Sequence, residues 1–190
     1  TIALWGSAVT SKTSKVRIAE GDTSSQLAIS LISSTGNITD QAGNTMSKPY
    51  SITGNNLDDV SVIKVDGVSP SITKVTANPS TGVMAQDETT DITVHFNEEV
   101  TLVGTINFIL SSHADSTLQI TTAGMASGLD DNNNPISKGT KTYTVVDGDL
   151  EASDLDVSTI TLSNLGTITD NAGNEITTVS IPSDQELKDN

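Results

Sequence analysis

A heptapeptide occurs twice in this chain. Residues 38–44 read Ile-Thr-Asp-Gln-Ala-Gly-Asn, and residues 168–174 read Ile-Thr-Asp-Asn-Ala-Gly-Asn, so the copies differ at one position of seven. Self-similarity at a fixed spacing is the signature of a repeat architecture, in which one structural unit recurs along the chain. Since the copies lie 130 positions apart, the 190 residues hold about one and a half units. The chain is therefore expected to begin inside a module.

The similarity extends on both sides of the heptapeptide. Upstream, residues 16–22 (Val-Arg-Ile-Ala-Glu-Gly-Asp) correspond to residues 143–149 (Tyr-Thr-Val-Val-Asp-Gly-Asp). Downstream, a weaker correspondence joins residues 51–59 to residues 180–189, because both contain Ser-Ile followed by an acidic stretch with a leucine. The first unit thus matches only the later part of the second one.

Strand signals dominate the sequence. Val, Ile and Thr alternate with polar residues in short runs, and Gly, Asn, Asp, Ser and Pro separate the runs, as in half-buried β-strands joined by turns. No convincing amphipathic helix is present. We predict an all-β fold of tandem Ig-like β-sandwich modules, the first one incomplete. Residues 1–65 would be the C-terminal part of a module plus a linker, and residues 66–190 a complete module. The expected strands include residues 92–96, 105–110, 117–121, 142–146, 160–163 and 176–181.

The charge of the chain is acidic and uneven. The formal net charge is −15, and nearly all of it falls after residue 66. Nucleic-acid binding is not expected, because it requires a basic face that displaces counterions from phosphate. The absence of Cys excludes a disulfide framework, and no apolar run approaches 18 residues, so membrane insertion is not expected either. Any export signal would lie outside this stretch.

Several motifs occur in the order found in one known family. Together they resemble the bacterial Ig-like repeats that form the extender regions of large surface adhesins, including RTX-type biofilm adhesins. The resemblance covers residues 66–190 and most of residues 12–52, with an acidic, Asn-rich insertion at 130–134 as a departure. It implies extracellular modules that hold a distal domain away from the cell, with Ca²⁺ near the junctions. The motifs are Asp66–Pro70 with Ile72–Val75, Asp91–Val100, Tyr143–Asp149, Asp154–Asp156 and Asp170–Asn174.

Strand counting places acidic residues at the two ends of the second module. We name the end where this module begins its entry pole, and the opposite end its exit pole. Glu98 would end the second strand at the entry pole, together with the loop 170–174, the insertion 130–134 and the linker residue Asp66. The exit pole would collect acidic residues from 86–91 and from 147–156.

The candidate metal ligands come from these acidic groups and from the equivalent positions of the first unit. Ca²⁺ takes six to eight oxygen ligands with tolerant geometry. A ligand set without His or Cys favours Ca²⁺ over Zn²⁺ or Cu²⁺. No EF-hand loop is present, so separate loops would build the site. The expected ligands are Glu20, Asp22, Asp58, Asp66, Glu98, Asp170 and Asn174.

A purely structural interpretation competes with the metal site. Asp40 and Asp170 would then bond only to the backbone of their own turns, and Gly43 and Gly173 would supply a positive φ. The sequence does not distinguish the two interpretations.

An enzyme is not expected. His95 would face outward from its strand, His113 lies in a turn, and no metalloprotease or nucleophile-elbow motif is present. Two alternatives to a structural rod remain open. One is a ligand- or glycan-binding adhesive module, and the other is a filament subunit whose incomplete first unit receives strands from another chain. The expected partners are neighbouring copies of the module or chain, and a host or abiotic surface.

Overall fold

The computed structural model describes residues 11, 13–50, 52, 54–112, 117–152 and 154–187. The chain divides into two compact units, Thr1–Val68 and Ser69–Asn190, three residues beyond the boundary expected from the sequence. Each unit is described by itself. His113 and the ends of the downstream repeat at Ser51 and residues 188–189 lie outside the described residues.

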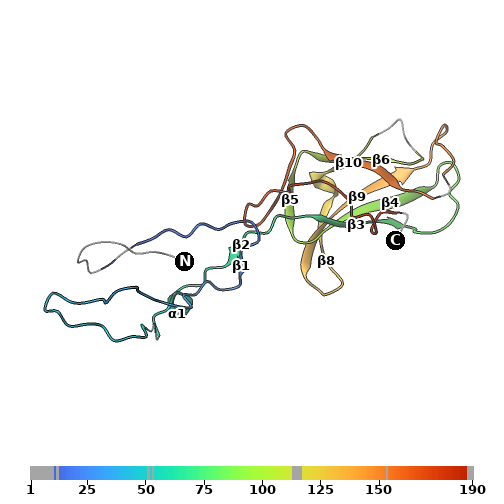
Figure 1. The fold of residues 1–190 in the computed structure, drawn as a ribbon. Helices are drawn as coiled ribbons and strands as arrows, with labels where there is room; N and C mark the ends of the chain where they lie inside the picture. Colours follow the sequence, from blue (N-terminus) through green and yellow to red (C-terminus); the bar gives the residue numbers. More distant parts are fainter. Residues whose placement is uncertain are drawn as a thin grey trace. The chain divides into compact units, whose positions relative to one another are not determined.

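The second unit is built from antiparallel strands, as Figure 1 shows. One sheet has the order β3-β4-β9-β8, a second the order β10-β6-β7, and a third pairs β11 with β5. The all-β prediction is therefore confirmed. The strands are β3 (Ile72–Asn78), β4 (Thr89–Phe96), β5 (Val100–Val103), β6 (Thr105–Leu110), β7 (Leu118–Thr121), β8 (Met125–Leu129), β9 (Pro135–Thr144), β10 (Val157–Leu162) and β11 (Thr167–Asp170), with a short 3₁₀ turn, η1, at Thr122–Gly124.

The core of the second unit follows from strict alternation along its strands. On β4, Ile92, Val94 and Phe96 are buried while the residues between them are half-exposed, because successive side chains of a strand point to opposite faces. On β6, Ile106 and Phe108 alternate in the same way. The buried side chains of both strands belong to one apolar cluster, so the β4 and β6 sheets enclose a common core.

The strand predictions need three corrections. The segment 176–181 was expected to form the last strand, which is wrong, since it pairs only through an isolated bridge between Thr169 and Glu175. Its alternation instead reflects packing, because Ile176 is buried in the core. Two short strands, β5 and β8, were not predicted, and β9 begins seven residues before the expected start at 142.

The first unit carries little regular structure in its described residues. Its strand β1 (Thr23–Ser24) pairs antiparallel with β2 (Val65–Asp66), and α1 (Leu57–Val60) is a single helical turn. A capping box holds α1, since the Asn56 side chain accepts the backbone N–H at the third helical position and Asp59 accepts the N–H of Asn56 at 2.9 Å. No helical turn was expected at these residues.

The hairpin around the repeated heptapeptide has the same hydrogen bonds in both units. The backbone N–H of Met46 donates to the carbonyl of Ile38 at 2.8 Å, and the N–H of Ile176 donates to the carbonyl of Ile168 at 2.9 Å. An isolated antiparallel bridge flanks the loop in each case. The sequence repeat is therefore also a repeat of local structure.

The upstream repeat forms matching turns. Asp22 accepts the backbone N–H of Ala19 at 2.8 Å through its carboxylate, and Asp149 accepts that of Val146 at 2.8 Å. The glycine before each aspartate has a positive φ, as the turn requires. Since the match lies well outside the heptapeptide, the two units share more than one loop.

Candidate metal centre

The loop Asp170–Asn174 is held by the carboxylate of its first residue. One oxygen of Asp170, Oδ1, accepts the backbone N–H groups of Ala172 and Asn174, both at 2.8 Å. The other, Oδ2, accepts the side-chain amide of Asn174 at 2.7 Å. Gly173 has φ +92°, a conformation that L side chains rarely adopt. The expectation that Asp170 bonds to its own turn is thus confirmed.

The same five-residue loop occurs at residues 40–44. Asn44 donates to the two carboxylate oxygens of Asp40 from its backbone and its side chain, both at 2.8 Å, and Gly43 has φ +90°. Here the whole loop is exposed, whereas Asp170 is buried. The repeat therefore conserves the geometry of the loop, while its burial differs between the units.

A third copy of this loop lies at residues 130–134. Asn134 donates to Asp130 at 2.8 Å from its backbone and 2.9 Å from its side chain, and Asn133 takes the positive φ of +63°. This segment, expected as an insertion relative to the resembled family, closes the hairpin between β8 and β9. The signal was present in the sequence as Asp and Asn four residues apart, with Asn in place of Gly at the fourth position.

The loop Asp170–Asn174 lies against the turn between β4 and β5. Carboxylate oxygens of Glu98 and Asp170 lie within 4.8 Å of one another, and the side-chain amide of Asn171 donates to Glu99 at 3.3 Å. The prediction that Glu98 and this loop share the entry pole is confirmed. Two carboxylates at this separation present the oxygen ligands that hard cations take.

Asp170 retains limited capacity for an ion. A carboxylate offers about four acceptor positions, and hydrogen bonds within the loop occupy three of them. Burial acts to raise the pKa of Asp170, but the hydrogen bonds from Asn174, Gly173 and Ala172 outweigh it, so the pKa is lowered. The carboxylate is therefore charged at neutral pH, and its own loop already uses most of its acceptor positions.

The candidate ligands of the first unit lie in two places. The turn carrying Glu20 and Asp22 contacts the end of β2, because the N–H of Gly67 donates to the carbonyl of Asp22 at 2.8 Å. On β2, Asp66 accepts the N–H of Val68 at 3.2 Å. The pairing of β1 with β2 therefore brings the turn with Glu20 and Asp22 next to Asp66. Asp58 lies on α1, where its carbonyl accepts the Gln26 side chain.

The first unit alone does not assemble a metal centre. Within its described part, no three acidic or histidine side chains come together as a possible ion site. Asn174, the remaining candidate, uses its amide to fix Asp170. Of the predicted ligands in the second unit, Glu98 and Asp170 therefore lie together, and Asn174 holds the carboxylate of Asp170 in place.

The exit pole is held together by backbone contacts. The N–H of Asp87 donates to the carbonyl of Val145 at 2.9 Å, which places the turn 86–91 beside the start of the stretch 147–156. Asp149 is engaged there by the hydroxyl of Tyr143 at 2.6 Å. This pole is therefore acidic as predicted. The carboxylate of Asp149 accepts hydrogen bonds from the Tyr143 hydroxyl and the Val146 backbone N–H.

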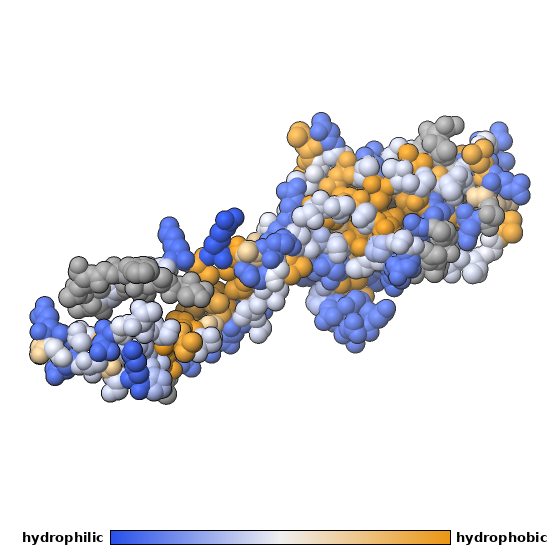
Figure 2. All heavy atoms as spheres, in the orientation of Figure 1, coloured by the Kyte–Doolittle hydropathy of each residue, from blue (hydrophilic) through white to orange (hydrophobic). Residues whose placement is uncertain are grey.

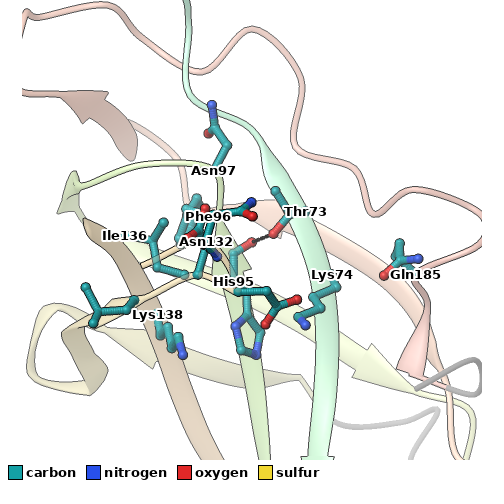
Figure 3. Close-up of a pocket in the computed structure, with 12 residues that line it drawn as sticks. Thr73, Lys74, His95, Phe96, Asn97, Asn132, Ile136, Lys138 and Gln185 are labelled. Atoms are coloured by element: carbon teal, nitrogen blue, oxygen red, sulfur yellow. Dashed lines mark hydrogen bonds between the residues drawn. The ribbon is translucent and has the colours of Figure 1, made fainter. Parts of the chain in front are cut away.

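A groove of about 370 Å³ lies on the β3-β4-β9-β8 sheet, with His95 at its centre (Figure 3). Burial, together with the charges of Lys138 and Lys74, lowers the pKa of His95 to about 4. The ring nitrogen Nε2 lies 2.9 Å from the hydroxyl of Thr76. His95 is neutral at pH 7 and faces away from the core, as the alternation of its strand predicts.

The chain has no recognised relative in the comparisons with known proteins. No family model matches the sequence, and neither a curated protein nor a solved structure matches it significantly. The described residues include no helix with the length and apolar character needed to cross a membrane. Function is accordingly inferred from the residues of the chain and from the resemblance noted above.

Proposed function

We propose that the chain provides tandem structural modules of an extracellular bacterial surface adhesin, Ig-like in fold and stiffened by Ca²⁺. The main support is the recurrence of the same loop and the same turn in both units, each closed by equivalent hydrogen bonds to an aspartate. Recurrent units whose stability is a sum of module and neighbour terms are suited to building a rod. The family resemblance of residues 66–190 points in the same direction.

The proposed ion lies at Glu98 and Asp170. Two charged carboxylates this close repel one another, and a divalent cation removes that repulsion. The expectation from the sequence that the linker residue Asp66 adds a further ligand stays a prediction. Water and backbone carbonyls would complete the six to eight oxygen ligands that Ca²⁺ takes.

Thermal unfolding in the presence of Ca²⁺, Mg²⁺ or a chelator tests this proposal. We expect Ca²⁺ to raise the Tm of the second unit and EGTA to lower it, while Glu98→Gln removes most of this difference. Glu151→Gln makes the same charge change in an exposed loop and is the matched control. Identical melting curves with Ca²⁺ and with EGTA would exclude the ion.

A second candidate function is the recognition of a polar ligand such as a glycan. The groove around His95 favours it, since Asn97, Asn132 and Gln185 line it beside Lys74 and Lys138. Its volume is within the range of small-molecule sites, about 300–1,000 Å³. A glycan array probed with and without Ca²⁺ separates the two functions, because strong sugar binding lost on Lys138→Ala would favour recognition over a purely structural role.

A further inference from the structure

The first unit exposes apolar side chains whose equivalents in the second unit are buried. Figure 2 shows apolar surface on both units. Ile18 is exposed too, and its equivalent Val145 packs against the core of the second unit. Three pairs of equivalent residues give the contrast in exposed fraction: Ile38 at 45% and Ile168 at 0%, Met46 at 51% and Ile176 at 8%, Val16 at 54% and Tyr143 at 3%.

In the second unit, residues that precede Tyr143 in the sequence pack around the equivalent side chains Tyr143, Ile168 and Ile176. Strand β10 pairs with β6, and β11 pairs with β5. Tyr143 lies opposite Thr90 of β4. The three covering strands all belong to residues 69–142, which we name the front half of the module. The back half is then residues 143–187.

The first unit contains a back half without a front half. Its residues 27–32 and 37–40, equivalent to β10 and β11, belong to no strand in the described structure. They form isolated bridges to Tyr50 and Thr45, and the backbone of Leu27 and Ile29 bonds to Ile63 and to the Asn56 side chain. The reason is that the strands corresponding to β6 and β5, which would pair with them, are not among the residues of this unit. Segments of this kind are able to add a strand from a partner.

Tyr50 gives a second, independent indication of a missing partner. Its side chain is 7% exposed, the only buried large apolar residue in the described part of the first unit. Its hydroxyl has no hydrogen-bond partner among the described residues. Buried polar groups are rarely left without a partner in a finished structure.

We propose that the apolar face of the first unit, formed by Val16, Ile18, Ile38 and Met46, is a docking surface for a front half of the same module type. The occupant is a β-segment with the pattern of residues 69–142. It would add strands equivalent to β6 and β5 beside residues 27–32 and 37–40. This assignment does not depend on Ca²⁺ or on an adhesive role.

A second copy of residues 1–190 is a poorer occupant than an unpaired front half. These residues hold two back halves and one front half, and that front half is already paired with residues 143–187. Opening one module to complete another would exchange one set of buried contacts for an equivalent set. An unpaired front half adds contacts without that loss.

A duplicated front half tests the inference. Residues 69–142 are joined directly ahead of residue 16, in the order found in the second unit, and the rest of the chain is kept. Hydrogen exchange of residues 27–46 is compared with that of the natural chain. We expect the fusion to slow exchange there by at least about tenfold, as for amides moved from a frayed segment into a paired strand. Binding of anilinonaphthalene sulfonate, an apolar-surface dye, should fall in parallel.

A matched fusion carries Ile106→Asp and Phe108→Asp in the added copy only. It should leave the exchange of residues 27–46 as fast as in the natural chain, because the added strand no longer presents an apolar face. If the first fusion does not fold, the added segment is placed after residue 190 through a Gly-Ser linker. Protection of β10, whose sequence is not duplicated, confirms in each case that the original second unit is intact.

Two results overturn the inference. One is unchanged exchange at residues 27–46 in both fusions while β10 remains protected. The other is a natural chain that is dimeric by light scattering and already protected at these residues, which would make a second copy the occupant.

Discussion

Asn174 binds both carboxylate oxygens of Asp170, one from its backbone N–H at 2.8 Å and the other from its side-chain amide at 2.7 Å. The loop that carries the candidate ion ligand is therefore closed by its own side chains before any ion is bound. The same pair of bonds closes the loops that begin at Asp40 and Asp130. An ion at Asp170 would therefore share the carboxylate oxygens that already accept these hydrogen bonds.

Replacing Asp170 should destabilise the second unit. Asp170→Ala removes a buried acceptor from the N–H groups of Ala172 and Asn174, and the expected loss is ~2–4 kcal/mol in the free energy of unfolding. Urea denaturation measures it. Asp40→Ala breaks the same bonds in an exposed loop and should leave the transition of the second unit unchanged. Equal effects of the two substitutions would contradict this account of the loop.

The positive φ at position 173 should limit which residues can replace Gly173 without loss of stability. Gly173→Ala is expected to cost ~1–2 kcal/mol, because a Cβ is strained in the left-handed region. Gly173→Asn should cost less, since Asn133 occupies the equivalent position of the third loop at φ +63°. No atom lies within 4 Å of the position of an added Cβ, so a clash would not explain the loss. Equal stabilities of Gly173→Ala and Gly173→Asn would argue against the conformational origin.

His95 predicts a pH dependence of stability. Its pKa in the folded state is about 4, below the ordinary value of 6.5, so the unfolded state takes up the proton first as pH falls. Stability should therefore decrease between about pH 6.5 and pH 4. His95→Gln should remove this contribution while leaving that of the carboxyl groups. Tm values measured across this range give the comparison, and parallel profiles for the two proteins would contradict the burial of a neutral imidazole.

The hydroxyl of Tyr143 should contribute to the stability of the second unit. It donates to Asp149 at 2.6 Å and lies 3.1 Å from the hydroxyl of Ser112. Tyr143→Phe keeps the ring and should cost ~1–3 kcal/mol, as for a hydrogen bond to a charged acceptor. Tyr50→Phe is a matched control, because the Tyr50 hydroxyl has no partner among the described residues. A Tm drop for Tyr50→Phe as large as that for Tyr143→Phe would contradict this assignment.

The sequence predicted the parts of the fold that rest on alternation. Residues 105–110 were expected as a strand and are β6, because Ile106, Phe108 and Leu110 are buried at every second position while the residues between them are half-exposed. The segment 176–181 carries a similar pattern but forms no strand. Alternating apolar residues indicate which side chains enter the core. They do not indicate whether a neighbouring strand is available for backbone hydrogen bonding.

The candidate site was predicted only in part. Strand order was sufficient to place Glu98 and Asp170 at one pole, since consecutive strands reverse direction. The relation of Asp130 to Asp170 was missed because Asn133 replaces the glycine that marked the other two loops. Which carboxylate oxygens remain available depends on hydrogen bonds, and these follow from loop geometry that spacing alone does not specify.

Calorimetric titration of Ca²⁺ into the natural chain and into Glu98→Gln is the most direct test of the proposed ion site. We predict saturable binding to the natural chain and a loss of affinity of at least about tenfold in Glu98→Gln, because one charged oxygen ligand is removed. Glu151→Gln should bind as the natural chain does. An absence of binding heat in the natural chain, or equal affinities for the natural chain and Glu98→Gln, would contradict a Ca²⁺ site at Glu98 and Asp170.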